Sequence, residues 1–595
     1  MGHNRAMQRP ADSTQTAATP SRLERLVPIA AWIRFYSRED FSGDLVAGIV
    51  TAILLVPQGM AFALLAGLPP QAGIYASILP PIAYAIFGTS RTLAVGPVSV
   101  AAIMVANALA QLPEGSDPVG AALVIAMLCG AILVAMGVAR LGVFANFLSH
   151  PVLSGFTSAA AIIIVFSQLP GLTGAQWPTL ARFAADPGAG LRSISAVHPA
   201  AFSIGLGSVA LLLFAARPLQ RLLQSFGVSL VSALLLSRTA PLLVVVAGAL
   251  AAAAMNAGVA VVGEIPHGLP ALSLVLPAPG SISSLAVSAL LISLVAYVES
   301  LSIAKVLANR RRQRIDPNQE LIALGAANFC GGLSSGMPVA GGFSRTMVNY
   351  AAGARTQLAS IITALLVAVA VLAFAPLLAF VPKAALAAII IVAVVRLIDL
   401  RGAVLIWRYD RIDGAVLSLT MIGVLLLGIE EGLAVGIALS LASLALRAAH
   451  PHVAILGRLR GSEHFRNVRR HQVETWPQLL LMRVDENLNF ANASFLESAI
   501  ATELAARRDL QHVILVMSSV NAIDSTALEA LERVAVSVRE AGVSLHLSDV
   551  KGPVMDKLKR AMIEHWLGEG QVFLSAHLAV ETLAPAASAQ PSPAR

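Results

Sequence analysis

The sequence predicts an α-helical membrane protein with a small α/β domain at its C-terminal end. Charged side chains make up 12% of the 595 residues, against roughly 25% in soluble domains, and the mean hydropathy is +0.77. Apolar runs long enough to cross a bilayer recur from about residue 45 to residue 449. They must be helical because lipid satisfies no exposed backbone group. From about residue 452 onward, charges return and the apolar runs shorten.

The apolar region divides into fourteen segments, and the charges between them indicate their orientation. Arginines follow the even-numbered segments, so the positive-inside rule places those loops and both termini in the cytoplasm. We expect the first span to act as its own insertion signal, with no cleaved signal peptide. The region 216–240 allows two interpretations, an interfacial helix or an extra span. Loops on the other side carry acids, among them Asp117, Glu430 and Glu431. The predicted segments are 45–66, 72–88, 97–112, 119–139, 147–169, 198–215, 240–258, 284–305, 319–333, 343–353, 356–376, 384–398, 414–429 and 432–449.

The two halves of the apolar region show signs of a repeat. The stretches 150–169 and 381–398 share a proline, small residues and an Ile-Ile-Ile-Val run. Because seven is odd, two halves of seven spans each would have opposite orientations, which is a transporter architecture. Chance similarity between runs rich in Ala and Ile explains this pair equally well.

Four regions follow from these patterns. We expect a cytoplasmic N-terminal segment at 1–40, a transmembrane domain at 41–450, an α/β domain at 451–585 and a disordered tail at 586–595. The strands of the α/β domain are predicted at 476–485, 512–520 and 543–550, and its helices at about 491–507, 525–541 and 552–567.

Composition and motifs exclude several classes of function. Cys129 and Cys330 both lie in apolar segments, so neither a disulfide framework nor a thiolate metal site is expected. The net charge of +8 comes from basic loops between spans, and we interpret it as topology. The glycine-rich stretches GAGLRS and GGLSSG lack the lysine of a P-loop. We therefore expect no catalytic site, no metal, no cofactor and no nucleic-acid partner.

Two short segments, 97–112 and 343–353, are the strongest pointers to a binding site. Both follow helix breakers, and paired broken helices in the two halves of a transporter surround its substrate. Each helix N-terminus exposes N–H groups and about half a positive charge, so two facing ends would cradle an anion. Arg345 adds a full charge suited to an oxyanion. Alternatively, Arg345 reaches the membrane interface or pairs with an acid for structural reasons.

Glu299 and Gln58 are further candidates. Glu299 is the single acid of the segment 284–305, and a lone acid at that depth suggests a function. Burial favours its neutral form and a nearby Arg345 its charged form, so its proton occupancy would respond to a bound anion. A permanent structural pair with Arg345 is the alternative. Gln58 and Phe62 lie on one helix face and offer an amide and an aromatic wall, although Gln often simply bonds a neighbouring helix.

Five motifs together resemble the sulfate permease (SulP) family of anion transporters, and the resemblance covers roughly residues 40–585. They occur in the order VPQGMAFALLAGLPPQAGIYAS, AVGPVSV, VVGEIPHGLP, YVESLSIAK and GFSRTMVN. The resemblance implies a core and a gate domain built as a seven-plus-seven inverted repeat, usual dimerisation and a C-terminal STAS domain. It also implies an anion between the N-termini of the third and tenth segments.

Carried over by motif, the resemblance implies roles for individual residues. The substrate-binding residues would be Gln58, Phe62, Val98, Ser99, Ser344 and Arg345. Glu299 resembles the acid associated with proton coupling. The tail motif NAIDSTALEAL resembles the STAS site that is phosphorylated in some anti-sigma-factor antagonists, which makes Ser525 and Thr526 regulatory candidates. Alternatively, Thr526 and Glu529 form a capping box for the next helix.

The expected function is proton-coupled sulfate uptake by alternating access. The alternatives are a bicarbonate or dicarboxylate symporter, an uncoupled anion exchanger or channel, and a signalling protein anchored in the membrane. The proton is the expected coupling ion. The expected partners are a small oxyanion, membrane lipid, a second copy of the chain and a cytoplasmic protein that binds the STAS domain. The expected location is the inner (plasma) membrane.

Overall fold

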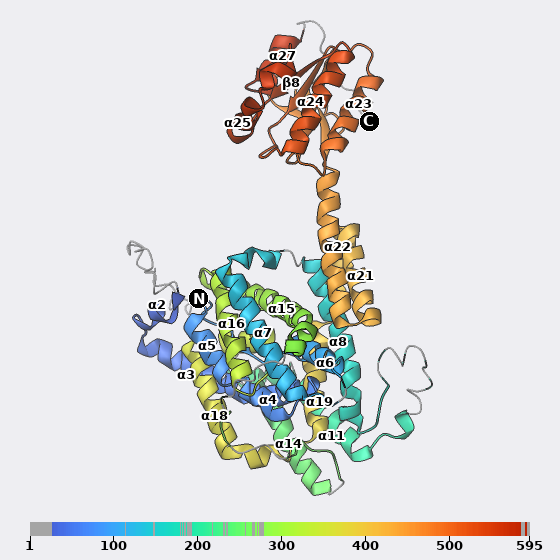
Figure 1. Cartoon of the computed structure of the whole chain (residues 1–595). Helices are drawn as coiled ribbons and strands as arrows, with labels where there is room; N and C mark the ends of the chain where they lie inside the picture. The colour runs from blue at the N-terminus through green and yellow to red at the C-terminus, as the bar shows by residue number, and fades with distance from the viewer. Residues whose placement is uncertain are drawn as a thin grey trace. The chain divides into compact units, whose positions relative to one another are not determined.

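A computed structural model describes most of the chain (Figure 1). It divides into two compact units, Met1–Ser440 and Leu441–Arg595. The expectations for residues 1–25, for 264–267 of the VVGEIPHGLP motif and for most of the tail 586–595 lie outside the described residues. The described residues are 26–113, 115–146, 149–178, 180, 183, 186, 188, 193–216, 218–229, 233, 236–237, 239–255, 258–263, 268–270, 272, 279–584 and 590–591.

The first unit is helical, and each predicted segment coincides with a helix or with two short ones. Six of the described helices are long and apolar enough to cross a membrane, or seven if α11 and α12 form one bent span. The other segments are shorter or broken helices, which a transporter core tolerates because neighbouring elements satisfy their backbone groups. The helices are α2 (Ile29–Ile33), α3 (Arg38–Leu65), α4 (Pro70–Tyr75), α5 (Leu79–Phe87), α6 (Ser99–Ala110), α7 (Pro118–Val138), η1 (Leu141–Asn146), α8 (His150–Thr173), α11 (Pro199–Ala216), α12 (Pro218–Ser225), α14 (Ala240–Met255), α15 (Pro279–Arg311), α16 (Pro317–Leu333), α17 (Phe343–Ala351), α18 (Leu358–Leu378), α19 (Lys383–Val394), η2 (Val395–Leu397), α20 (Leu400–Tyr409), α21 (Arg411–Leu427) and α22 (Ile429–Ala449).

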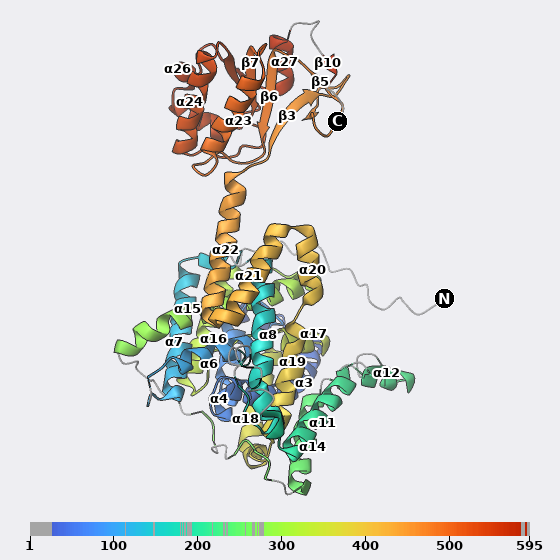
Figure 2. The ribbon, with the colours of Figure 1, turned by 90° about the vertical axis from the view of Figure 1, so that its right-hand side faces the viewer.

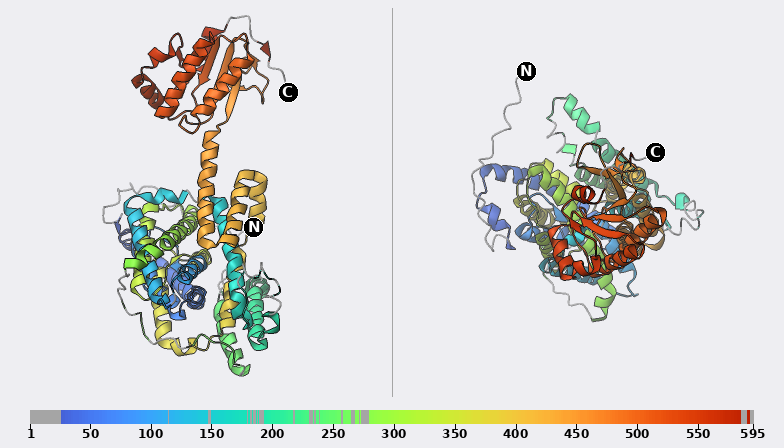
Figure 3. Two further views of the ribbon diagram at one scale, coloured as in Figure 1. Left: turned by 45° about the vertical axis from the view of Figure 1, so that its right-hand side comes forward. Right: turned by 90° about the horizontal axis from the view of Figure 1, so that it is seen from above.

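The helices pack as two bundles. In the first bundle, α16 packs on α7 and α5, α18 packs on α3, and α15 lies along α7 (Figure 1 and Figure 3). In the second bundle, α8 packs on α19 and α21, and α11 packs on α19 and α14. Gly432 and Gly436 let α22 approach α21 and α8 closely, since a Cβ at Gly432 would lie 2.3 Å from Cα of Val424. The bundles meet mainly along α3 and α19.

A pair of very short strands crosses the middle of the first bundle. β1 (Val95–Gly96) and β2 (Ala340–Gly341) pair antiparallel and lead into α6 and α17 respectively. The side chain of Asn328 on α16 bonds both the N–H and the carbonyl oxygen of Val339, just before β2. The N-termini of α6 and α17 are therefore held side by side, although they are far apart in the sequence.

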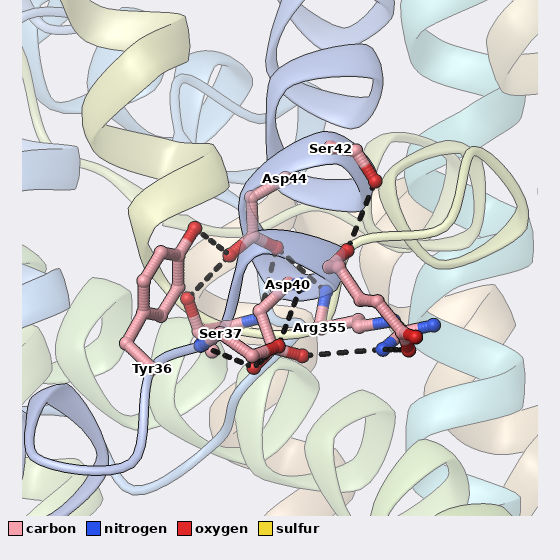
Figure 4. A network of polar contacts seen from close by, with 8 residues as sticks. Tyr36, Ser37, Asp40, Ser42, Asp44 and Arg355 are labelled. Atoms are coloured by element: carbon pink, nitrogen blue, oxygen red, sulfur yellow. Dashed lines mark hydrogen bonds and ion pairs between the residues drawn. The ribbon is translucent and has the colours of Figure 1, made fainter.

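The N-terminal end of α3 is tied to the chain between α17 and α18. Asp44 is fully buried and accepts hydrogen bonds from the N–H groups of Arg355 (2.6 Å) and Thr356 (2.9 Å), from the Thr356 hydroxyl (2.5 Å) and from the Tyr36 hydroxyl (3.1 Å). Figure 4 shows this network beside Asp40, which forms a capping box with Ser37. The contact sets the position of α17 relative to α3.

The second unit is an α/β domain built on one sheet (Figure 2). The strand order is β10-β5-β3-β6-β7-β8-β9, and β6 to β9 run parallel. Leu480 packs on one face with α23 and α24, whereas Leu481 packs on the other with α27, as expected for a strand buried on both sides. The three predicted strands and three predicted helices are present, with the last helix divided into α25 and α26. The elements are β3 (Val453–Arg458), β4 (Phe465–Asn467), β5 (Glu474–Thr475), β6 (Leu479–Val484), α23 (Ala493–Ala506), β7 (His512–Val516), α24 (Ser525–Glu540), β8 (Ser544–Ser548), α25 (Gly552–Arg560), α26 (Ile563–Leu567), β9 (Val572–Phe573), α27 (Ala576–Leu583) and β10 (Gln590–Pro591).

Candidate functional site

A cavity of about 380 Å³ lies where the N-termini of α6 and α17 meet. A water molecule occupies roughly 30 Å³ in the liquid, so a small anion and several waters fit. All seven residues predicted for the anion and for coupling line this cavity, and α19 and η2 of the second bundle close one wall. The lining residues are Gln58, Phe62, Pro97, Val98, Ser99, Glu299, Gly342, Phe343, Ser344, Arg345, Met347, Ala393, Arg396 and Leu397.

The side chain of Arg345 is held in the interior by backbone carbonyl groups. It is 2% exposed. Its Nε donates to the carbonyl oxygen of Ala94 (3.2 Å), Nη1 to that of Pro97 (3.1 Å) and Nη2 to that of Ala340 (3.4 Å). These three acceptors are neutral, so they orient the guanidinium without cancelling its charge. Three of its five N–H groups are thereby used, which leaves donors for a ligand.

Two glycines provide the space that the guanidinium occupies. A Cβ at Gly96 would lie 3.2 Å from Cζ of Arg345, and a Cβ at Gly342 would lie 3.2 Å from its Nη2. Both distances are shorter than ordinary van der Waals contact, so a side chain at either position would push the guanidinium. Gly342, near Arg345 in the sequence, and Gly96, near it only in space, therefore mark the close approach of backbone and charge.

The two helix N-termini at the cavity keep their first N–H groups free of side-chain caps. The N-cap residues are Val98 for α6 and Gly342 for α17, and neither makes a side-chain cap hydrogen bond. Both helices thus present unpaired backbone donors and the positive ends of their dipoles to the cavity. Ser99 lies in the first turn of α6 and Ser344 in the first turn of α17, and both add hydroxyl groups to the cavity lining.

Glu299 lines the cavity from α15 and is half-buried. Among the described residues, no ion pair or hydrogen bond joins it to Arg345, so the two charges share one cavity without direct contact. The next residue, Ser300, accepts a hydrogen bond from the N–H of Gly341 (2.8 Å) and so fixes α15 against β2. The role of Glu299 in proton coupling stays a prediction.

Gln58 and Phe62 line the cavity from α3, each 7% exposed. Pro57 lies inside α3 next to Gln58 and removes one backbone hydrogen bond from the helix at this level. The two side chains stand one turn apart on the same face, as their spacing predicts. The structure brings them to the same cavity as Val98 and Arg345.

Sequence reasoning missed several residues that support or line the site. Gln357 donates to the carbonyl groups of Ser90 and Leu93 before β1, and the Thr346 hydroxyl accepts the N–H of Ala94. Buried polar side chains in apolar helices are the signal that could have identified them. Arg396 had been interpreted only as an orienting charge, yet it lines the cavity.

The regulatory candidates of the second unit lie at the start of α24. Ser525 and Thr526 are exposed, in the first turn of that helix. The predicted capping box of Thr526 and Glu529 is wrong, because the N-cap is Asp524, whose carboxylate accepts the N–H of Ala527 at 2.9 Å. The cap falls two positions earlier than expected, because Ser525 and Thr526 already lie in the helix. Nothing in these contacts tests phosphorylation.

Sequence comparison gives two matched families. A model described as the Sulfate permease family matches residues 41–420, and a STAS domain model matches residues 470–579. The chain is 35% identical to "Sulfate transporter 4.1, chloroplastic" of Arabidopsis thaliana over 574 residues, which cover 94% of this chain and 82% of that one. It is 33% identical to a probable sulfate transporter of Mycobacterium tuberculosis over 561 residues, covering 93% and 97% respectively.

Solved structures with the same fold include two transporters. The murine Slc26a9 anion transporter in the inward-facing state matches with a TM-score of 0.83 at 23% identity, covering 98% of this chain and 99% of that chain. The transmembrane domain of the cyanobacterial bicarbonate transporter BicA matches with a TM-score of 0.57 at 24% identity, covering 68% and 98%. At these identities the likeness shows the fold alone.

Proposed function

The chain belongs to the sulfate permease family, and from this membership and the cavity around Arg345 we propose that it carries a small oxyanion across a membrane, sulfate first. Relatives that are 30% identical or more are named sulfate transporters, which supports sulfate over bicarbonate or a dicarboxylate. The family consists of transporters, so the chain is not an enzyme.

One observation carries this proposal, the buried guanidinium of Arg345 between two helix N-termini. A charge in a membrane interior is costly unless a partner compensates it. Here the hydrogen-bond acceptors of the guanidinium are carbonyl oxygens, which leave the positive charge in place. An anion in the cavity completes the compensation and meets backbone donors from α6 and α17.

We propose that Glu299 couples anion movement to a proton. A charged Glu299 repels an anion in the shared cavity, and a protonated one does not. Binding of the anion and binding of the proton therefore favour each other, and this mutual effect is the basis of symport. The two bundles supply the movement, because the site lies between α6 and α17 of the first and α19 of the second.

Transport into proteoliposomes tests both parts of the proposal. We expect radiolabelled sulfate to accumulate under an imposed pH gradient, and unlabelled sulfate to compete better than bicarbonate, fumarate or chloride. Glu299→Gln should abolish accumulation driven by the gradient but keep sulfate exchange. Glu431→Gln, which changes an exposed acid of α22, serves as the matched control.

Two results would contradict the proposal. Accumulation by Glu299→Gln at the parent level under the pH gradient would remove the coupling role. Sustained conductance without stoichiometric proton flux would indicate an uncoupled channel instead. We further propose a dimer in the plasma membrane with both termini in the cytoplasm, which crosslinking and protease accessibility can test.

A further inference from the structure

A buried acid of α22, Glu430, joins the two bundles away from the anion cavity. Glu430 stands in the first turn of α22, is 7% exposed, and accepts a hydrogen bond from the Ser288 hydroxyl of α15 at 2.9 Å. The sequence had suggested that Glu430 lies in the loop between the last two predicted spans. Instead, the start of α22 falls at Ile429, and the helix turns Glu430 toward the first bundle while Glu431 stays exposed.

The contact is incompletely paired. The second carboxylate oxygen, Oε1 of Glu430, is buried and has no hydrogen-bond partner, and the same holds for Nδ2 of Asn107 on α6. Asn107 lies beside the Glu430 carboxyl. Buried polar atoms without partners are rare and costly in proteins. Because Nδ2 is a donor and Oε1 an acceptor, the two atoms could pair with each other, or with water if the bundles separated.

The cluster lies on one side of the anion cavity. Ser288 precedes Glu299 by eleven residues on α15, which is about 16 Å along the helix, and Asn107 follows Ser99 by eight residues, about 12 Å along α6. Ser288 therefore lies on the part of α15 away from Arg311, and Asn107 lies at the same level because both flank the Glu430 carboxyl. The end of α15 at Arg311 is shared by α17, because Arg311 stacks on the ring of Tyr350 at 4.6 Å.

The anion cavity extends toward the face where α15 and α17 end, which is rich in arginine. A second cavity of about 110 Å³ shares Gln58, Ser344 and Arg396 with the anion cavity. Its other lining residues include Gln220 of α12, after the end of α11. The even-numbered predicted segments end on the face rich in arginine. Arg396 lies at the end of the twelfth segment and α12 follows the sixth, so both lie on that face. The two cavities thus lie toward this face, whereas the contact of Glu430 with Ser288 lies toward the opposite one.

We propose that Glu430, Ser288 and Asn107 form an interbundle latch that closes the opposite face and opens once in every transport cycle. The inference rests on the alternating access of the proposed function. When α22 moves away from α15, Glu430 exchanges the Ser288 hydroxyl for water. Loss of the hydrogen bond between Ser288 and Glu430 should therefore favour the state that is open on the opposite face.

The size of the effect follows from the type of hydrogen bond. A hydrogen bond to a charged group shifts an equilibrium by about tenfold to a hundredfold when one partner is removed. Ser288→Ala and Glu430→Ala should each raise the population open to the opposite face by at least about tenfold. Glu430→Gln keeps an acceptor for the Ser288 hydroxyl, so it should leave this population at the parent level.

Cysteine labelling measures this population without requiring transport. The reporter is Ser99→Cys in the cavity, labelled by a membrane-impermeant maleimide added only to the opposite face of sealed vesicles. The full-length chain without the reporter gives the background from Cys129 and Cys330. The matched controls are Ser302→Ala, whose hydroxyl bonds only its own helix at Val298, and Glu431→Ala, whose carboxylate is exposed.

The expected result is labelling about tenfold faster in Ser288→Ala and Glu430→Ala than in either control. The double variant should be no faster than the single ones, because both remove the same bond. Equal labelling in variants and controls, or additive effects in the double variant, would overturn the latch. Normal labelling of the reporter chain, combined with no sulfate transport by the chain without the reporter, would instead count against the proposed function alone. Size-exclusion profiles identify a variant that fails to fold. In that case Glu430→Gln decides the question: labelling at the parent rate or slower supports the latch, and faster labelling contradicts it.

Discussion

Replacement of Arg345 is the most direct test of the anion site. Its guanidinium makes three hydrogen bonds to carbonyl oxygens, at 3.1 to 3.4 Å, and contributes a full charge to the cavity. A unit charge about 4 Å from an anion contributes about 4 kcal/mol at an effective dielectric constant of about 20. Desolvation and water in the cavity reduce this value, so we expect Arg345→Gln to weaken sulfate binding by roughly a hundredfold to a thousandfold.

Arg345→Lys separates charge from geometry. Lysine keeps the positive charge but cannot reach the carbonyl groups of Ala94, Pro97 and Ala340 from one planar fork. We therefore expect an intermediate loss, about tenfold to a hundredfold, in the same measurement.

Equilibrium binding of radiolabelled sulfate to the purified protein in detergent measures both variants. Arg401→Gln removes the same charge from an exposed position at the start of α20 and should bind as the parent does. Binding by Arg345→Gln within twofold of the parent would refute the reasoning. So would an equal loss in Arg401→Gln, because the effect would then reflect net charge rather than the site.

Three further predictions concern the groups that hold the site and the second unit. Gly342→Ala places a methyl group 3.2 Å from Nη2 of Arg345, at a φ of −90° that alanine readily adopts, and should raise the KM for sulfate about tenfold with little change in folding; an unchanged KM would contradict this. Asp44→Asn converts an acceptor of four hydrogen bonds into a poorer one and should cost about 2–4 kcal/mol of stability, seen as a lower melting temperature; a melting temperature equal to the parent's would count against the clamp. Burial, and then the neighbouring His512, lower the pKa of His546 from 6.5 to about 4. Between these two pH values the unfolded chain therefore binds a proton that the folded chain does not. The contribution of His546 to the stability of the second unit is complete above pH 6.5 and falls as the pH drops toward 4. His546→Asn should reduce the loss of melting temperature between pH 7 and pH 5, and an undiminished loss would show that other groups cause it.

Parts of the candidate site were predictable from the sequence because charged residues and helix breakers are rare in the apolar segments that contain them. Arg345 and Glu299 stand out because ionisable side chains are uncommon in apolar segments. Gly341 and Pro97 mark broken helices at matching places in the two halves. The structure then places both charges at one cavity, as these local signals indicate.

Contacts between distant parts of the chain were beyond the reach of local patterns. The acceptor of Arg345 Nε, Ala94, lies 251 residues away. Ser300, Asn328 and Gln357 bond the backbone around β1 and β2, but in the sequence they are ordinary polar residues in helices. Their importance depends on which carbonyl or N–H group faces them after folding.

The sequence by itself determined the membrane class, the α/β tail and the residues with unusual charge, because hydropathy and charge act locally on each segment. Only the tertiary structure decided which neighbours those residues have. Glu430 and Glu431 show the difference, since adjacent residues on a helix point about 100° apart. One is buried against Ser288 and the other is exposed, because packing between α22 and α15 sets the phase of the helix.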